Sequence, residues 1–567
     1  MSSVNIIVSH KGKKHDVEVD PESTGEVFKY QLFSLTGVEP DRQKILVKGG
    51  QLKDDTVMGK LGLKAGQTIM MMGTPGGGGG DLGRPAQPVK FVEDMTEAEA
   101  ARQEGAMPAG LENLGNTCYL NSTLQVMRSI PELQESLSTY EYGASGPQDA
   151  GSHLDMTGQL RRLYKSMSET QSGFAPFNFL QALRTAFPQF AERTKDGRGY
   201  AQQDAEEAWS QIVAQLRQKL EMKKRREDEP ATNLVDRYMA GEFTSVLECN
   251  EQEARDAGEQ PVTSVEPFLK LNCHIQKDTN HLRDGIMNGL TETIEKRSPT
   301  LEREAVYTKK SKISRLPKYL TVHFVRFFWK REVQKKAKIM RKVTFPHELD
   351  VVEFCVDDLK KLLIPVRDKV REVRKDEEDM ERARKRRKKN PLLDGDVDSL
   401  EQSSSKDSKK KDDKKGKGAS ASADGDIEME GETFKTDAEV EAEREATLLE
   451  AKRELYQLIS QNQGAQDGDN QSGLYELRGV VTHQGASADS GHYTAYVKKT
   501  APLDPATGKP KESEDGNWWW FNDDKVSEVT ADKIDGLAGG GESHSALILL
   551  YRAISLPSAE DVAEKKA

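Results

Sequence analysis

The sequence predicts an α+β protein with a small N-terminal domain, a larger second domain and a charged insertion within the second. Residues 4–73 combine strand-like alternation with one helical pattern, over a length typical of one small domain. Residues 105–555 begin with an amphipathic helical pattern around Cys118 and finish with strand-like segments. Residues from about 368 to 445 are rich in charge and nearly free of aromatic side chains.

Composition limits the classes of function. A chain of 567 residues can hold two to four domains, and its net charge of −11 gives no case for nucleic-acid binding. No secretory signal opens the sequence and no run of about 18 apolar residues crosses a membrane. We therefore expect a reducing cytoplasmic or nuclear setting, which keeps a lone thiol available. No pattern indicates a cofactor. The four cysteines stand apart, without a C-x-x-C pair that would encode a disulfide framework or a zinc site: Cys118, Cys249, Cys273 and Cys355.

The N-terminal domain, residues 1–75, reads as a hairpin, a helix and two further strands. The helix begins after Pro21 and presents Phe28, Leu32 and Leu35 on one face. The strand candidates are residues 4–8, 14–19, 43–48 and 67–72. This pattern resembles ubiquitin along its whole length, which implies a β-grasp fold. Because Gly73 is followed by Thr74 and the chain runs on, we expect a fixed docking module and not a conjugated tail.

Two segments have the composition of linkers. Residues 76–104 are rich in glycine, proline and charge and predict a flexible connection to the second domain. Residues from about 368 to 445 cannot bury enough apolar surface to offset their ordering entropy, so we expect a disordered insertion. Its basic run at residues 384–389 fits either a nuclear-import signal or a solvated block of charge.

The chain returns to ordered structure after the insertion. Residues 447–461 have helical spacing, and residues 475–481, 491–497 and 546–551 read as strands. The tail, residues 556–567, is charged and expected to fray.

Cys118 lies where a glycine turn meets a helix. Gly115 permits the turn, and the apolar residues Leu120, Leu124 and Met127 follow at spacings of four and three. The N-terminus of a helix favours a thiolate. By position alone, Cys118 is equally well explained as a small buried hydrophobe.

Two downstream segments supply the partners that a nucleophilic thiol needs. His492 follows Gly491 at the start of a strand and can serve as general base and then general acid. Asn522 and Asp523 follow an aromatic run, and either side chain could orient the imidazole. The sequence chemistry does not choose between them. Asn113 and the backbone N–H of Cys118 are candidate donors to an oxyanion, although Asn113 equally fits a turn-forming residue.

These segments resemble the ubiquitin-specific protease family of papain-like deubiquitinating enzymes, over residues 105–555 apart from the insertion. The matching boxes read GLENLGNTCYLN at 110–121, GHYTAY at 491–496 and WFNDDKV at 520–526. The resemblance implies a catalytic domain with thumb, palm and fingers. It implies Cys118 as nucleophile, His492 as base, Asn522 as third member, Asn113 at the oxyanion and Asp523 as an assistant.

The resemblance also implies substrate contacts. The box QQDAEE at 202–207 resembles one whose aspartate meets the arginine-bearing ubiquitin tail, so Asp204 and Gln203, with Tyr493 of the histidine box, are expected to bind ubiquitin. Asp204 could serve as a helix N-terminal acid at the same time. Isolated Cys249 and Cys273 imply fingers without zinc. Residues 539–544 resemble a loop that occludes the cleft, and a plain surface loop is the alternative.

A ubiquitin-like domain joined to a zinc-free protease domain is the layout of the proteasome-associated member of this family. That likeness implies docking on the regulatory particle of the 26S proteasome, with activation on docking, and removal of ubiquitin from proteasome-bound conjugates. Leu46, Gly49 and Met72 occupy the apolar recognition patch of ubiquitin and are the expected docking residues, unless they are partly buried in the core. The alternative function is a largely non-catalytic, ubiquitin-binding regulator of the proteasome.

Overall fold

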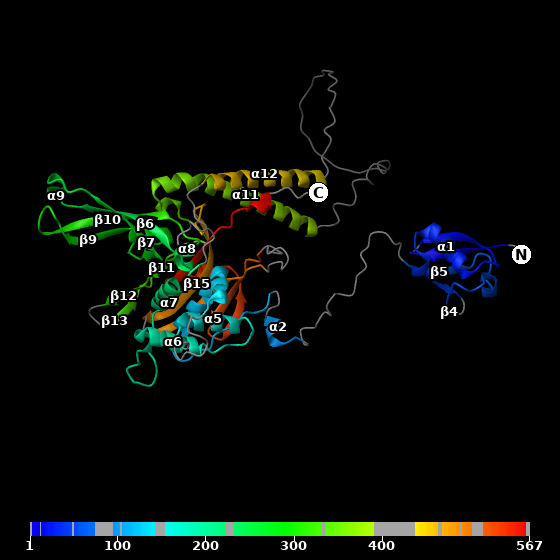
Figure 1. Ribbon diagram of the computed structural model, residues 1–567, viewed down its shortest axis with the longest axis horizontal. Helices are drawn as coiled ribbons and strands as arrows, with labels where there is room; N and C mark the ends of the chain where they lie inside the picture. Colours follow the sequence, from blue (N-terminus) through cyan, green and yellow to red (C-terminus); the bar gives the residue numbers. More distant parts are fainter. Residues whose placement is uncertain are drawn as a thin grey trace, which may run out of the picture. The chain divides into compact units, whose positions relative to one another are not determined.

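The computed structural model divides into two compact units, Met1–Asp94 and Met95–Ala567, which are described separately (Figure 1). The residues that the structure describes are 3–11, 13–47, 50–73, 95–101, 105–141, 154–222, 232–330, 335–389, 437–462, 468–487, 490–501 and 514–562.

The first unit is a five-stranded sheet with one helix, α1 (Gly25–Thr36), packed on it. The strands are β1 (Val4–His10), β2 (Lys13–Val19), β3 (Lys44–Val47), β4 (Gly50–Gln51) and β5 (Thr68–Met72), in the order β2-β1-β5-β3-β4. β1 pairs antiparallel with β2 and parallel with β5. Alternating buried residues such as Ile6, Val8, Ile69 and Met71 face the helix. The β-grasp fold that the sequence predicts is confirmed.

One expected core residue of α1 lies outside the core. Phe28 and Leu32 are buried, but Leu35 in the last helical turn is exposed. Gly37 ends the helix with φ of 69°, a left-handed conformation that glycine adopts without strain. Val38, which follows this cap, is buried in the core. The Gly37 cap, and not the helical spacing of Phe28, Leu32 and Leu35, therefore decides which side chain fills the core at the C-terminal end of α1.

The helical part of the second unit forms one layer of its core. Its helices are α2 (Glu97–Ala101), α3 (Cys118–Arg128), α4 (Pro131–Thr139), α5 (Met156–Met167), α6 (Phe177–Ala186), α7 (Ala205–Lys219) and α8 (Leu234–Tyr238). α3 lies at the centre and is buried on nearly all sides. It packs against α7 and against the sheet through β16.

The main sheet of the second unit supports the site from the other side. Its strand order is β18-β17-β16-β15-β19-β11-β8, and β14 pairs with β15. The strands are β8 (Leu271–His274), β11 (Tyr319–Val325), β14 (Glu348–Asp350), β15 (Leu474–Ser487), β16 (Ser490–Lys498), β17 (Trp518–Asn522), β18 (Lys525–Val529) and β19 (Ser545–Ala553). The strand predictions at 475–481, 491–497 and 546–551 are confirmed within β15, β16 and β19.

A second sheet extends from this body (Figure 1). Its order is β7-β6-β10-β9, from β6 (Gly241–Cys249), β7 (Val262–Phe268), β9 (Thr291–Arg297) and β10 (Glu304–Arg315). The helices α9 (Gln252–Asp256) and α10 (Leu282–Gly289) and the hairpin of β12 (Phe327–Lys330) and β13 (Lys335–Lys338) accompany the two sheets. The short α13 (Asp532–Asp535) precedes β19.

The prediction of disorder from about residue 368 to 445 is wrong at both ends of this insertion. α11 (Asp357–Lys389) and α12 (Asp437–Gln461) extend into it from either side and pack on one another (Figure 1). Val366, Val370 and Val373 of α11 meet Ala451 and Leu455 of α12 in a small apolar cluster. These few apolar residues recur at helical spacing, so a helix can bury them although the mean composition is highly charged. Residues 390–436 lie outside the described part of the chain.

Two shorter segments also differ from expectation. Within the predicted linker, α2 is capped by Thr96, whose hydroxyl accepts from the Glu99 N–H at 3.3 Å while Glu99 accepts from the Thr96 N–H at 2.9 Å. The Ala100 carbonyl accepts from Gln171 at 3.3 Å, which holds this turn on the second unit. Within the predicted frayed tail, α14 (Ala559–Val562) packs on α12. None of the described helices is both long and apolar enough to cross a membrane.

Candidate active site

Cys118 is the first residue of α3, and its side chain is 3% exposed. The preceding turn uses Gly115 with φ of 94° and Asn116 with φ of 54° to bring the chain into the helix. Cys118 approaches the backbone N–H of Tyr493 on β16. The structure therefore brings the cysteine turn to the residue that follows His492, although the two segments are far apart in sequence.

His492 is held by Asn522. The imidazole Nε2 lies 2.6 Å from the Asn522 amide oxygen, across the adjacent strands β16 and β17. An acceptor on Nε2 fixes the proton there, which leaves Nδ1 as the basic nitrogen. Of the two side chains that the sequence left open, Asn522 is the one that contacts the imidazole.

Asp523 makes a different set of contacts. It occupies the tight turn between β17 and β18 with φ of 52°. Its two oxygens accept from the Asn113 amide at 3.0 Å and from the Asn121 amide at 2.8 Å. The Asp523 carbonyl also accepts from the Leu111 N–H at 2.9 Å. Asp523 thus joins the β17–β18 turn to the segment that precedes Cys118.

Asn113 is a turn-forming residue, which is one of the two interpretations that its position allowed. Its amide oxygen accepts from the backbone N–H groups of Gly115 at 3.0 Å and Thr117 at 3.2 Å, which makes it a turn-forming residue. Its amide nitrogen carries two hydrogens and gives one to Asp523. The role of Asn113 as a donor to an oxyanion stays a prediction.

Burial governs the charge state of the thiol. Removal from water raises the pKa of Cys118 to about 11, and the carboxylate of Asp523 acts in the same direction. The backbone N–H groups of Tyr493 and Tyr119 oppose this rise. Burial therefore opposes the thiolate that the helix N-terminus favours, and the expected preference for a thiolate stays a prediction.

Residues 539–544 lie beside His492 through His544. His544 has its ring centroid 6.4 Å from that of His492, and burial together with His492 lowers the pKa of His544 to about 4. The Glu542 carbonyl accepts from the Gly485 N–H at 3.0 Å. The buried Arg326 guanidinium donates to the carbonyls of Ala538, at 3.1 Å, and Ala546, at 2.9 Å. In this conformation the loop is tied to its surroundings at both ends and in the middle.

The expected ubiquitin contacts have distinct environments. Asp204 is the N-cap of α7, where its carboxylate accepts from the Glu206 N–H at 2.9 Å. Gln203 has a buried amide nitrogen without a hydrogen-bond partner among the described residues. The Tyr493 side chain is only 1% exposed and packs against His483 with ring centroids 4.6 Å apart. The substrate roles of these three residues stay predictions, and for Tyr493 only its backbone borders the thiol.

Cys249 and Cys273 lie on different strands as free cysteines. Each is buried and unpaired, Cys249 at the end of β6 and Cys273 in β8. Among the described residues, no group of three or more histidine, cysteine or acidic side chains could hold a metal ion.

The apolar patch of the first unit is exposed. Leu46 and Met72 are 45% and 48% exposed, and Met70, which pairs with Leu46 across the sheet, is 55% exposed. Their burial in the core, the alternative left open by the sequence, is excluded. Gly49 lies outside the described residues, and the docking role of the patch stays a prediction.

Sequence reasoning did not single out Asn121. Its amide donates to the carbonyls of Leu111 and Glu112, both at 3.2 Å, as well as to Asp523. An asparagine at the third position after Cys118, between the apolar residues Leu120 and Leu124, is the signal that could have found it, because buried amides need partners.

Comparison with known proteins extends these observations. Residues 109–551 match the model of the ubiquitin carboxyl-terminal hydrolase family, and residues 4–76 match that of the ubiquitin family. The chain is 42% identical to ubiquitin carboxyl-terminal hydrolase 6 of Schizosaccharomyces pombe, over 97% of this chain and 99% of that protein. It is 37% identical to ubiquitin carboxyl-terminal hydrolase 7 of Arabidopsis thaliana, over 97% and 99%. It is 30% identical to ubiquitin carboxyl-terminal hydrolase 14 of Caenorhabditis elegans, over 96% and 92%.

Proposed function

Since this chain belongs to the ubiquitin carboxyl-terminal hydrolase family and is a deubiquitinating cysteine protease, we propose that Cys118, His492 and Asn522 carry its chemistry and that it releases ubiquitin from proteasome-bound conjugates. The observation that carries the catalytic assignment is the 2.6 Å contact between His492 Nε2 and the Asn522 amide oxygen, on strands that bring Tyr493 to Cys118.

The first half of the proposed reaction forms a thioester. The Cys118 sulfur attacks the carbonyl carbon of the terminal glycine of ubiquitin while its proton passes to His492 Nδ1. The Asn113 amide and the Cys118 backbone N–H donate to the resulting oxyanion. The C–N bond then breaks, and His492 returns the proton to the leaving lysine amine.

The second half restores the enzyme. His492 takes a proton from water as the water oxygen attacks the thioester carbonyl, and the C–S bond breaks. The proton returns to the cysteine sulfur, and ubiquitin leaves with a free carboxylate. Because burial raises the pKa of Cys118 to about 11, transfer to His492 during attack is more accessible than a preformed thiolate.

We further propose that residues 539–544 control access to Cys118, and that Asp204 and Gln203 hold the ubiquitin tail. The buried, unpartnered amide nitrogen of Gln203 supports the second assignment, because such a donor gains a hydrogen bond when a backbone carbonyl arrives. Docking on the regulatory particle through Leu46 and Met72 rests on the resemblance and on their exposure. A cytoplasmic and nuclear location belongs to the same proposal.

Ubiquitin with a C-terminal electrophile tests these assignments. The full chain and Cys118→Ala are treated with this probe, with and without proteasomes. We expect labelling of Cys118, faster with proteasomes, and none of the variant. Absence of labelling in both conditions would contradict the proposal and favour a non-catalytic regulator. Equal labelling in both conditions would retain the nucleophile but contradict activation by docking.

A further inference from the structure

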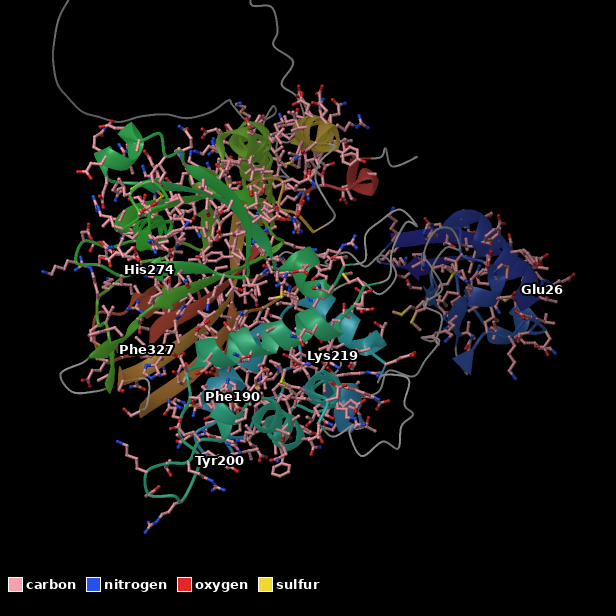
Figure 2. The ribbon with its side chains drawn as sticks, turned by 60° about the vertical axis from the view of Figure 1, so that its left-hand side comes forward. Glu26, Phe190, Tyr200, Lys219, His274 and Phe327 are labelled. Carbon is pink, nitrogen blue, oxygen red and sulfur yellow. The ribbon has the colours of Figure 1, made fainter. Side chains whose placement is uncertain are left out.

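Two contacts hold the catalytic turn from either side of Cys118, and both come from residues 187–200, the segment between α6 and α7 (Figure 2). On one side, the Asn116 amide donates to the Tyr200 carbonyl at 3.0 Å. On the other side, the Tyr119 ring stacks on the Phe190 ring, with centroids 6.0 Å apart and planes 11° apart. We call residues 187–200 the turn clamp.

The hydrogen bond from Asn116 to Tyr200 stabilises an unusual backbone conformation of Asn116. Asn116 is not glycine, yet it adopts φ of 54°, a left-handed conformation that disfavours most side chains. Asparagine tolerates this region when its short side chain makes a local hydrogen bond. The Asn116 side chain makes its hydrogen bond with a distant group, the Tyr200 carbonyl, and this contact holds it in the left-handed turn. The turn that presents the thiol is thereby coupled to a residue more than 80 positions away.

Tyr200 is itself held by two guanidinium groups. Arg184 lies 3.5 Å and Arg193 lies 4.5 Å from the centre of its ring. The Arg184 Nε also donates to the Phe190 carbonyl at 3.2 Å, and Arg193 pairs with Tyr200 as an antiparallel bridge. The cation–π contacts therefore hold the Tyr200 ring in place, and the ring restrains the backbone of Tyr200. The Tyr200 carbonyl in turn accepts the hydrogen bond from the Asn116 amide.

We propose that Tyr200 is a positioning residue for Cys118, acting through Asn116. Misplacement of a reacting atom by about 1 Å can reduce a rate by about a hundredfold, so a turn that is held from both sides favours attack. This inference goes beyond the proposed function and rests on its assignment of Cys118 as nucleophile. Neither Asn116 nor Tyr200 contacts the reacting groups in this role.

The experiment treats the full chain with ubiquitin that carries a C-terminal electrophile. It measures two quantities separately: the maximal rate at which the probe inactivates the enzyme, and the probe concentration that gives half of this rate. Asn116→Gly removes the amide but accepts the left-handed backbone, so it does not add strain. Tyr200→Leu removes the cation–π contacts, whereas Tyr200→Phe keeps the ring. Arg198→Gln is the matched control, since it changes a cation in the same segment that makes no ring contact in the described structure.

We expect Asn116→Gly and Tyr200→Leu each to lower the maximal rate about tenfold, as loss of one hydrogen bond predicts, with half-saturation changed less than twofold. The maximal rate of the double variant should be no lower than that of the slower single variant, because both substitutions interrupt the same series of contacts from Tyr200 through Asn116. Tyr200→Phe and Arg198→Gln should match the wild-type chain. Thermal unfolding shows that each variant remains folded.

Two results would overturn the inference. One is an unchanged maximal rate in Asn116→Gly, and the other is a change confined to half-saturation, which would make the clamp a binding surface. Both results differ from a result that would contradict the assignment of Cys118 as nucleophile, because that assignment is tested only by the labelling of Cys118→Ala. Additive losses in the double variant would also contradict coupling through one chain of contacts.

Discussion

Asn522 and Asp523 are neighbours in sequence with separate tasks. Asn522 ends β17 and bonds His492, whereas Asp523 begins the turn to β18 and bonds Asn113 and Asn121. A two-residue turn directs successive side chains apart, so one residue can orient the base while the next holds the oxyanion donor. The two carry different parts of the proposed reaction.

Substitution at these two positions should give different kinetic results. We expect Asn522→Ala to lower kcat about 10²- to 10³-fold and to change its pH profile, because an unheld imidazole is a poor base. Asp523→Ala should lower kcat about 10- to 100-fold without moving the acidic limb, because it releases Asn113 and Asn121 but leaves His492 bonded to Asn522. Turnover of a fluorogenic ubiquitin amide between pH 6 and 9 measures both effects.

Asp523→Asn provides the matched control for that comparison. It keeps one acceptor oxygen for Asn113 or Asn121 and should lie between the wild-type chain and Asp523→Ala. A greater loss of kcat in Asp523→Ala than in Asn522→Ala would contradict the assignment of the third residue.

The buried thiol makes its own prediction. Because burial raises the pKa of Cys118 to about 11, the thiolate fraction should rise about tenfold per pH unit from pH 7 to 10. The rate at which chloroacetamide alkylates Cys118 in the free chain should rise in proportion to this thiolate fraction. Mass spectrometry identifies the alkylated cysteine, with Cys118→Ala as the control. A plateau below pH 9 would show that the helix N-terminus outweighs burial.

Among the elements, the α11–α12 hairpin has two parts with different stabilising interactions. Near its base, Val370, Val373 and Leu455 form an apolar cluster with Leu474 and Ile554. Farther along, exposed ion pairs join Arg384 to Glu441 and Glu445 and Lys452 to Glu377. Apolar burial stabilises the first part, whereas screened surface pairs contribute little to the second.

Substitutions in the two parts should therefore differ in size. Leu455→Ala should lower the free energy of unfolding of the second unit by about 2–4 kcal/mol, because it leaves a cavity. Arg384→Gln should change it by less than about 1 kcal/mol. Denaturant unfolding measures both, and hydrogen exchange should show faster exchange in the distal helical turns of Arg384→Gln. Equal destabilisation by the two variants would contradict this division.

At the scale of the whole molecule, the two compact units have separate cores. The core of the first unit contains Ile6, Phe28, Leu32 and Ile45, and among the described residues this cluster includes none from the second unit. A unit with its own core can unfold by itself. The catalytic core of the second unit therefore need not depend on the folding of the ubiquitin-like unit.

Calorimetry of the full chain tests this independence. We expect two transitions, and Ile45→Ala should lower the midpoint of the smaller one by about 10 °C or more, as loss of about 2–5 kcal/mol predicts for a small domain. The larger transition should stay within about 1 °C. Leu547→Ala, at a buried position in the second unit, is the reciprocal control. A shift of both transitions by either variant would indicate one cooperative unit.

Local patterns identified most strands and the helix that follows Cys118, because alternation and helical spacing depend on neighbouring residues. They failed where a few apolar residues are spread through charged sequence, as in α11, since mean composition hides a narrow stripe. They also failed at Leu35, where the Gly37 cap changes which side chain enters the core.

The sequence by itself determined the types of reactive group and their order along the chain, and the presence of a ubiquitin-like unit. Those properties are encoded in short segments. Only the tertiary structure decided that Asn522 and not Asp523 contacts His492, that Asp523 holds Asn113, and that burial raises the pKa of Cys118. These depend on strand register, on the turn after β17 and on the depth of α3, which arise when distant segments pack together.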